Sequence, residues 1–314
     1  MRYYFAPMEG VTDSVYRRLH HKYFSGITRY YMPFISPTIH RALTNREERE
    51  LPFAADENFC AVPQVLTKVS EDFLWAAQVC KDRGYEEVNL NVGCPSGTVV
   101  SKGKGSGMLR DPAALDRFLE EIFSRTPVAL SVKTRLGMED PEEFPALLEI
   151  FNRYPIQELT IHPRVRKAFY KGSIHEEMFR YAVENSKNPL CFNGNITNLT
   201  QIAKLQEQYP QLESVMVGRG LIADPGMFDP KGTTLDALQP FMEELLETYL
   251  VLFGGSRNAM FRMKENWSML LHRFEGSEKL GKQLRKTTDL SEYRDITRRI
   301  FQTLPLKNEF APDW

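Results

Sequence analysis

The stretch "EVNLNVGCPSG" (residues 87–97) joins an apolar strand pattern directly to a loop that carries reactive and polar side chains. Apolar residues alternate with asparagines as far as Gly93, and a glycine and a proline then flank Cys94. Glycine and proline end strands and favour turns. The stretch therefore predicts a buried strand that ends near Asn91, followed by a loop that exposes a thiol.

Similar strand patterns recur along the chain, and most are separated by amphipathic helix patterns. The pairs Asp111-Pro112 and Asp140-Pro141 are typical helix starts, with an acidic N-cap followed by proline. Residues 36–59 are polar and interrupt the alternation with either a helix or an excursion. We predict eight strands, at residues 2–7, 29–35, 60–66, 87–93, 128–135, 158–163, 190–195 and 214–220, and helices at 13–24, 71–83, 112–124, 142–154, 175–186 and 199–209.

This alternation predicts an α/β fold, a (β/α)8 TIM barrel, because such barrels bury parallel strands on both sides and place functional groups at their carboxyl ends. Polar residues, or else glycine, proline or cysteine, follow nearly every predicted strand. An open, doubly wound sheet would also alternate, but it concentrates function at one switch point, so the barrel is favoured. Beyond residues 229–240 the pattern is helical. We therefore predict a catalytic barrel domain at 1–235 and a small all-helical domain at 236–314.

Composition narrows the class of protein. The formal net charge is −1 over 314 residues, so any nucleic-acid binding must come from local clusters of Lys and Arg. No apolar stretch approaches the ~20 residues of a membrane helix, and the amino terminus lacks the apolar core of a secretory signal. The four cysteines form no CxxC pair, and we expect Cys60, Cys80 and Cys191 to be buried and inert. These features predict a cytoplasmic protein without a metal site.

The last two strand ends predict a ligand. The segments "NGNI" (193–196) and "GRG" (218–220) close strands seven and eight, where barrels commonly bind phosphate through backbone amides. Either segment alone is equally well explained as a glycine turn, but together they favour a phosphate. Lys133 and Gln64 point into the same mouth, which suits a flat ring system that needs a cation and an amide near its edge. Flavin mononucleotide (FMN) fits this set.

Seven motifs occur in the order and spacing of the tRNA-dihydrouridine synthase family, which the chain resembles. The resemblance continues into "RMKENW" (262–267), which is similar to the family's basic helical motif. It implies an FMN-containing barrel that uses NADPH to reduce selected uridines in tRNA to 5,6-dihydrouridine. The motifs are "APMEGVTD" (6–13), "PQVL" (63–66), "NLNVGCPS" (89–96), "VKTRLG" (132–137), "IHPRVRKAFYKG" (161–172), "NGNI" (193–196) and "VGRG" (217–220).

The resemblance assigns Cys94 as the acid that protonates uracil C5 after hydride transfer from flavin N5 to C6. A thiol with an ordinary pKa of ~8.5 is mostly protonated at neutral pH, which suits an acid; the alternative is a structural loop cysteine. At Asn195 the family commonly has Asp, so we expect backbone contacts there. The implied cofactor-binding residues are Pro7, Met8, Glu9, Gln64, Lys133, His162, Asn193, Gly194, Asn195, Gly218 and Arg219.

Other residues are candidates for RNA contact. The glycine-rich loop 96–109 suits a mobile lid that meets RNA, and residues 257–299 carry eleven Lys and Arg against six Asp and Glu, a net charge of +5. A basic helical region of this kind is typical of RNA binding, although solvated loops and helix faces could have the same composition. The predicted contacts with uracil or phosphate are Asn91, Lys102, Lys104, Arg164, Arg166, Arg262 and Lys264.

Three alternatives stay open. The same chemistry could act on ribosomal RNA. An FMN dehydrogenase for a free pyrimidine would share the phosphate site but would need no basic helical domain. A non-catalytic RNA-binding module would use the basic helices and leave Cys94 dispensable. We expect the protein to be a monomer.

Overall fold

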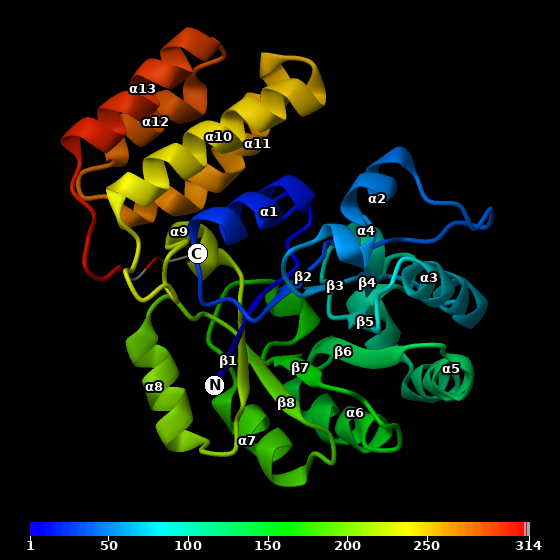
Figure 1. The fold of residues 1–314 in the computed structure, drawn as a ribbon. Helices are drawn as coiled ribbons and strands as arrows, with labels where there is room; N and C mark the ends of the chain where they lie inside the picture. The colour runs from blue at the N-terminus through cyan, green and yellow to red at the C-terminus, as the bar shows by residue number, and fades with distance from the viewer. Residues whose placement is uncertain (311, 313–314) are drawn as a thin grey trace.

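The computed structural model describes residues 1–310 and 312, and its centre is a nearly closed barrel of nine parallel strands (Figure 1). The sheet order is β3-β2-β1-β9-β8-β7-β6-β5-β4. The predicted TIM barrel is thus confirmed. The strands are β1 (Arg2–Phe5), β2 (Arg29–Tyr31), β3 (Ala61–Val62), β4 (Gln64–Val65), β5 (Glu87–Val92), β6 (Ala129–Arg135), β7 (Leu159–His162), β8 (Leu190–Asn193) and β9 (Ser214–Val217).

Residues 61–65 close the barrel by pairing with both of their neighbours. β3 pairs with β2, and β4 pairs with β5. Between them lies Pro63, which has no N–H to donate to a ladder, although its carbonyl accepts a hydrogen bond from the Asn89 N–H at 2.8 Å. The third predicted strand therefore exists as one segment that proline divides into two short strands.

Helices surround the barrel in the predicted order (Figure 1). The side chains of Asp13 and Asp111 cap the first turns of α1 and α5, and the cap at Asp111 confirms the helix start predicted there. At Asp140-Pro141 a 3-10 turn, η3 (Pro141–Glu143), precedes α6. The barrel helices are α1 (Ser14–Tyr23), α3 (Ser70–Asp82), α5 (Pro112–Arg125), α6 (Phe144–Phe151), α7 (Glu176–Asn185), α8 (Leu199–Gln208) and α9 (Arg219–Ala223).

The interrupting segment 36–59 contains helix α2 (Asn45–Glu50) and a 3-10 turn, η1 (Ala54–Asp56). It is fastened to the barrel by Arg17, whose buried guanidinium lies 3.1 Å from the Glu50 carboxylate. The segment delivers Cys60 to the amino end of β3, just before the first paired residue, and there the cysteine is exposed. The prediction that Cys60 is buried was therefore wrong, whereas Cys80 and Cys191 are buried.

The glycine-rich loop after β5 is folded and closely packed. It forms α4 (Gly97–Val100) and the 3-10 helix η2 (Gly105–Arg110), and residues 105–109 are buried. Gly105 adopts φ +57°, and a Cβ there would lie 2.9 Å from the Cys94 carbonyl oxygen. The loop predicted to be a lid thus contains a short helical support for the Cys94 loop, where Gly105 and Gly107 permit close backbone contact. Its mobility and its contact with RNA stay predictions.

The carboxyl-terminal region is helical, as predicted. Its helices are α10 (Leu235–Phe253), α11 (Ser256–Leu270), α12 (Glu278–Lys286) and α13 (Leu290–Thr303), with the 3-10 turn η5 (Leu271–Arg273) after α11. Trp267 anchors this region: it is buried and donates a hydrogen bond to the Tyr293 hydroxyl at 2.8 Å. Helix α10 packs on α1 and α11 packs on α9, so the apolar core is continuous with the barrel.

Among the described residues, no helix combines the length and the apolar character that crossing a bilayer requires.

Candidate active site

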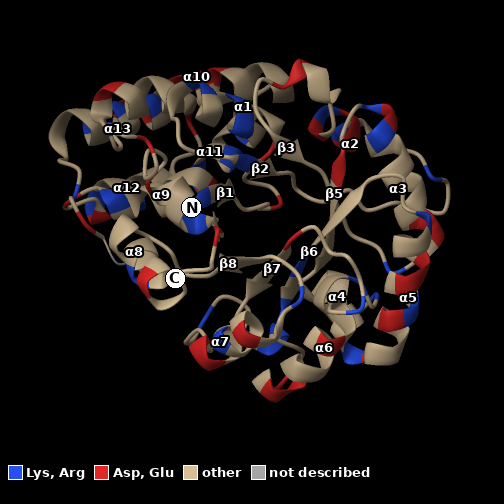
Figure 2. Ribbon diagram, turned by 60° about the horizontal axis from the view of Figure 1, so that its bottom comes forward, with Lys and Arg blue, Asp and Glu red and all other residues tan. Residues whose placement is uncertain are grey.

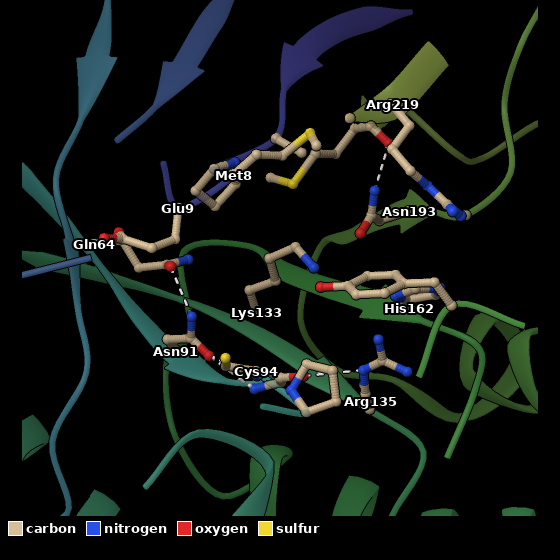
Figure 3. Close-up of a pocket in the computed structure, with 18 of the residues that line it drawn as sticks. Met8, Glu9, Gln64, Asn91, Cys94, Lys133, Arg135, His162, Asn193 and Arg219 are labelled. Atoms are coloured by element: carbon tan, nitrogen blue, oxygen red, sulfur yellow. Dashed lines mark hydrogen bonds between the residues drawn. The ribbon is translucent and has the colours of Figure 1, made fainter. Parts of the chain in front are cut away.

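The carboxyl ends of the barrel strands enclose a cavity of about 630 Å³ (Figure 3). This size is within the range of cofactor and ligand pockets. The strands are parallel, so the polar residues that follow them meet at one end of the barrel. The predicted residues that line the cavity are Pro7, Met8, Glu9, Gln64, Asn91, Cys94, Lys133, His162, Asn193, Gly194, Asn195, Gly218 and Arg219.

The Cys94 loop is held from both sides. The Asn91 side-chain oxygen accepts hydrogen bonds from the backbone N–H groups of Gly93 (3.1 Å) and Cys94 (2.9 Å). On the other side, the Cys94 carbonyl accepts from the Ser106 N–H (3.1 Å) and hydroxyl (2.9 Å). Burial raises the pKa of the thiol, although a hydrogen bond to the Ser96 backbone and nearby positive charge partly oppose this. The thiol therefore keeps its proton at neutral pH.

Positive charge is concentrated in the cavity. Burial lowers the pKa of Lys133 to about 8, and the positive charge of Arg135 contributes. Burial likewise lowers the pKa values of Arg135 and Arg219 to about 10. Among the described residues that line the cavity, only Glu9 is acidic, and it forms an ion pair with Arg46 of α2. Such a site is complementary to an anion, which would raise the pKa values of these side chains again.

His162 is neutral in this environment. The Arg164 guanidinium, which can only donate, lies 2.9 Å from its Nε2 atom, so Nε2 accepts. Burial and then the surrounding cations lower the pKa of the imidazole well below its ordinary value. Arg164 itself is fully buried and also donates to the Gly172 carbonyl (2.6 Å) and the Asn195 side-chain oxygen (3.2 Å). Arg164 could contact RNA only if the loop between β7 and Gly172 opened. Its contact with RNA stays a prediction.

The ends of β8 and β9 form a close backbone cradle. A Cβ at Gly220 would lie 2.1 Å from the Ile196 carbonyl oxygen, so only glycine lets the two segments approach this closely. Asn193 crosses between them, donating to the Met216 carbonyl at 2.7 Å. Asn195 has φ +45°, a left-handed conformation that asparagine tolerates. The segments predicted to bind phosphate are thus adjacent, and residues of both line the cavity.

Two predicted RNA-binding residues are on the loop after Cys94, and one is on the loop after β7. Lys102 is exposed, whereas Lys104 is half-buried and donates to the Ser36 hydroxyl at 3.2 Å. Arg166 is half-buried, and its guanidinium stacks 5.1 Å from the centre of the Phe169 ring. None of the three lines the cavity, whose described lining residues on these loops include Phe169.

Arg262 and Lys264 are on α11, where both already have partners within the chain. Arg262 lies 3.7 Å from the Asp13 carboxylate and 3.5 Å from that of Glu265. Lys264 donates to the carbonyls of Arg285 and Thr287 at the end of α12. These contacts join elements of the protein, and RNA binding through the two side chains stays a prediction.

Sequence reasoning missed Arg135 and Tyr170 as site residues. Arg135 is buried and donates to the Gly93 carbonyl (3.0 Å) and the Val165 carbonyl (3.2 Å), so it connects the loops after β5 and β7. The Tyr170 ring lies 5.2 Å from the guanidinium carbons of both Arg135 and Arg219. Period-two spacing from Lys133 would have placed Arg135 on the same strand face. Tyr170 has no comparable signal.

A family model described as dihydrouridine synthase matches residues 4–305. The chain is 28% identical to tRNA-dihydrouridine synthase B of Pasteurella multocida over 88% of its own length and 80% of the relative's. It is 30% identical to a probable tRNA-dihydrouridine synthase of Rickettsia bellii, over 70% of this chain and 67% of that one.

Among solved structures, morphinone reductase is similar with a TM-score of 0.50 at 13% identity, over 72% of this chain and 84% of the other, which shows a shared fold. The family model, in contrast, matches nearly the whole sequence, and the chain therefore belongs to the dihydrouridine synthase family.

Proposed function

We propose that this protein reduces uridines in tRNA to 5,6-dihydrouridine, with FMN as the resident cofactor and NADPH as the reductant. The observation that carries the proposal is the cavity itself: Cys94 faces a space in which Lys133, Arg135 and Arg219 gather with a single carboxylate among the described lining residues. The family membership and the names of the relatives support tRNA as the substrate.

The residues present fit FMN. The cradle formed by Asn193, Gly194 and Gly218 offers backbone groups to a phosphate, and Arg219 adds positive charge beside it. Lys133 would lie at the polar edge of the ring system, where its ammonium would stabilise negative charge. Pro7, Met8, Glu9, Gln64, Asn195 and His162 complete the proposed cofactor site.

When bound, FMN would supply the hydride that adds to uracil C6. Cys94 would then give its proton to C5 and be left as a thiolate, which solvent reprotonates. Its raised pKa keeps the proton available at neutral pH. Asn91 and Ser106 hold the loop so that the thiol faces the cavity. Uracil must leave its stack to reach the thiol, as in other enzymes that modify bases.

Exposed basic residues on α12 are the best candidates to hold tRNA. Lys279, Lys282 and Lys286 are exposed and lie on one face of the helix, opposite its buried residues. Figure 2 shows basic residues on this helix. Phosphate contacts require accessible positive charge, and α12 offers it without breaking the contacts that Arg262 and Lys264 make within the chain.

The test is a comparison of Cys94→Ala with the parent protein. Purified parent should carry flavin absorption, and NADPH should reduce it. The variant should retain FMN and its reduction, but in single turnover the pre-reduced protein should transfer hydride to tRNA ~10²–10⁴-fold more slowly, the usual contribution of general-acid catalysis.

Reoxidation of the variant by tRNA at the parent rate would assign Cys94 a structural role. The parent should also be assayed with ribosomal RNA and with free uridine and uracil. Preference for either over tRNA would replace the proposed substrate, and a protein that binds RNA but never flavin would be a binding module.

A further inference from the structure

A chain of buried amides runs through the barrel interior to the Cys94 loop. Asn89 donates to the Ser131 hydroxyl at 2.9 Å and accepts from the Gln64 amide at 2.7 Å. Gln64 in turn accepts from the Asn91 amide at 2.7 Å (Figure 3). Asn89, Gln64 and Ser131 are all 0% exposed, and Asn89 lies two residues before Asn91 on β5. We call these four side chains the amide relay.

The direction of the amide relay is determined at its Cys94 end. Backbone N–H groups can only donate, so the Asn91 atom that faces those of Gly93 and Cys94 must be its oxygen. Its NH2 group then faces Gln64, whose nearer atom must be Oε1. The Gln64 NH2 group consequently needs an acceptor at position 89. Only the final member, Ser131, has a hydroxyl that can rotate to suit its neighbour.

We propose that Asn89 is a positioning residue for the reaction, because its oxygen holds Gln64 in this orientation and Gln64 thereby holds Asn91. This inference rests on the proposed function. Each amide uses one N–H within the relay, and Asn91 and Gln64 both line the cavity, so their second N–H groups could serve as donors there. The cavity wall thus presents donors, which suit carbonyl oxygens of uracil or flavin and oppose an amino group at the same place.

Replacing the acceptor at position 89 tests the direction of the relay. Leucine in Asn89→Leu has nearly the size of asparagine but leaves the Gln64 NH2 group without an acceptor. This favours rotation of the Gln64 amide by 180°, and Asn91 must then rotate as well to keep its hydrogen bond with Gln64. A flipped Asn91 would present NH2 to the backbone donors of Gly93 and Cys94 and release the loop. Asn89→Asp keeps an acceptor for Gln64, and Ser131 can rotate to donate to it. The carboxylate of the Asn89→Asp variant would be buried on the sheet face that also carries Lys133. Lys133 pairs with Asn91 in the β5–β6 register.

The control is Ser131→Ala, which also leaves a buried donor unpaired but preserves the direction of the three amides. In single turnover with tRNA, FMN-loaded Asn89→Leu should react on the order of tenfold to a hundredfold more slowly than the parent, as expected for misplaced reacting groups. Asn89→Asp and Ser131→Ala should remain within a few-fold and keep the parent's flavin content and reduction by NADPH. Asn89→Leu is compared only after it has been loaded with FMN, because a flipped Gln64 would also alter the proposed cofactor site.

Hydrogen exchange of the full-length protein gives a readout that does not depend on activity. Exchange at the Gly93 and Cys94 amides should accelerate at least about tenfold in Asn89→Leu and remain at the parent value in Asn89→Asp. Parent-like exchange in Asn89→Leu, or equal acceleration in the leucine and aspartate variants, would overturn the positioning role. Parent protein that does not reduce tRNA would count against the proposed function, while the exchange rates would still decide the relay.

Discussion

Lys133 places a largely buried ammonium in the cavity, and its lowered pKa has a direct consequence for stability. Below about pH 8 both the folded and the unfolded protein hold this proton, so folding bears the whole cost of burying the charge. Between about pH 8 and 10.5 only the unfolded chain keeps it. The FMN-free protein should therefore become more stable as pH rises through this window, by about 3 kcal/mol in total from this group.

Lys133→Met should abolish that rise, stabilise the FMN-free protein at pH 7 and weaken FMN binding. The measurement is the free energy of unfolding in urea at several pH values. The difference between variant and parent isolates the contribution of Lys133, because all other titrating groups are common to both proteins. Exposed Lys81→Met is the matched control. Identical pH dependence in parent and Lys133→Met would mean that the ammonium is not buried in solution.

For single residues, the sequence indicated most of the cavity wall, because the carboxyl ends of all the parallel strands meet at the same end of the barrel. It did not reveal where long side chains would find partners. Arg135 bonds to two backbone carbonyls, and Arg262 lies beside a helix cap; such contacts depend on the approach of segments distant in the chain. The φ of +50° at Phe169 is likewise imposed by the folded loop.

Among the elements, η2 and the loop before it support Cys94 most directly. Gly105→Ala would place a methyl group 2.9 Å from both the Cys94 carbonyl oxygen and a Val99 methyl carbon, at a φ that favours glycine. The left-handed conformation alone costs about 1–2 kcal/mol. We expect at least that loss of stability, together with slower reduction of tRNA, because the Cys94 carbonyl must move.

Gly97→Ala is the matched control in the same loop. A Cβ at Gly97 would meet no atom within 4 Å, and the residue begins helix α4. Alanine there should leave stability unchanged or raise it by up to about 1 kcal/mol. Thermal unfolding and the rate of dihydrouridine formation check both variants. Equal behaviour of the two would show that η2 does not determine the position of Cys94.

Most strands and helices of the barrel were predictable because they have a clear apolar period, and α1 and α5 also begin at a capping side chain. The exceptions have physical causes. Glycine content in residues 96–109 gave no sign of η2, which depends on close backbone contacts at Gly105 and Gly107. The mobility of this loop stays a prediction. Segment 36–59 is held by the buried contact of Arg17 with Glu50, a tertiary interaction that no local pattern signals.

For the whole molecule, the main prediction concerns how the helical region holds RNA. Replacing Lys279, Lys282 and Lys286 with Ala should weaken tRNA binding and reduce the slope of log K against log[salt] by about 0.9 for every phosphate that the variant no longer neutralises. Reduction of bound flavin by NADPH should not change, because the cavity is untouched. Filter binding at several salt concentrations measures the slope.

The control replaces three exposed lysines on the outside of the barrel, Lys81, Lys187 and Lys204, which removes the same charge. An equal fall in slope for both triple variants would show that the effect is one of net charge. An unchanged slope in the α12 variant would move the RNA interface elsewhere, with Arg262 and Lys264 as the next pair to test.

Asp13 serves three elements at once. It caps α1, accepts a hydrogen bond from the Tyr249 hydroxyl of α10 at 2.8 Å, and lies opposite Arg262 of α11. A contact shared by a barrel helix and both long helices would oppose hinge motion between them, and α12 packs on α11, so the distance from α12 to the cavity would be nearly fixed. A tRNA bound at α12 would then present to Cys94 only the nucleotide whose distance from the bound part of the RNA equals the distance from α12 to Cys94. Under the proposed function, the protein would select a uridine by its distance along the folded RNA, and shortening or lengthening α10 and α11 would change which uridine is reduced.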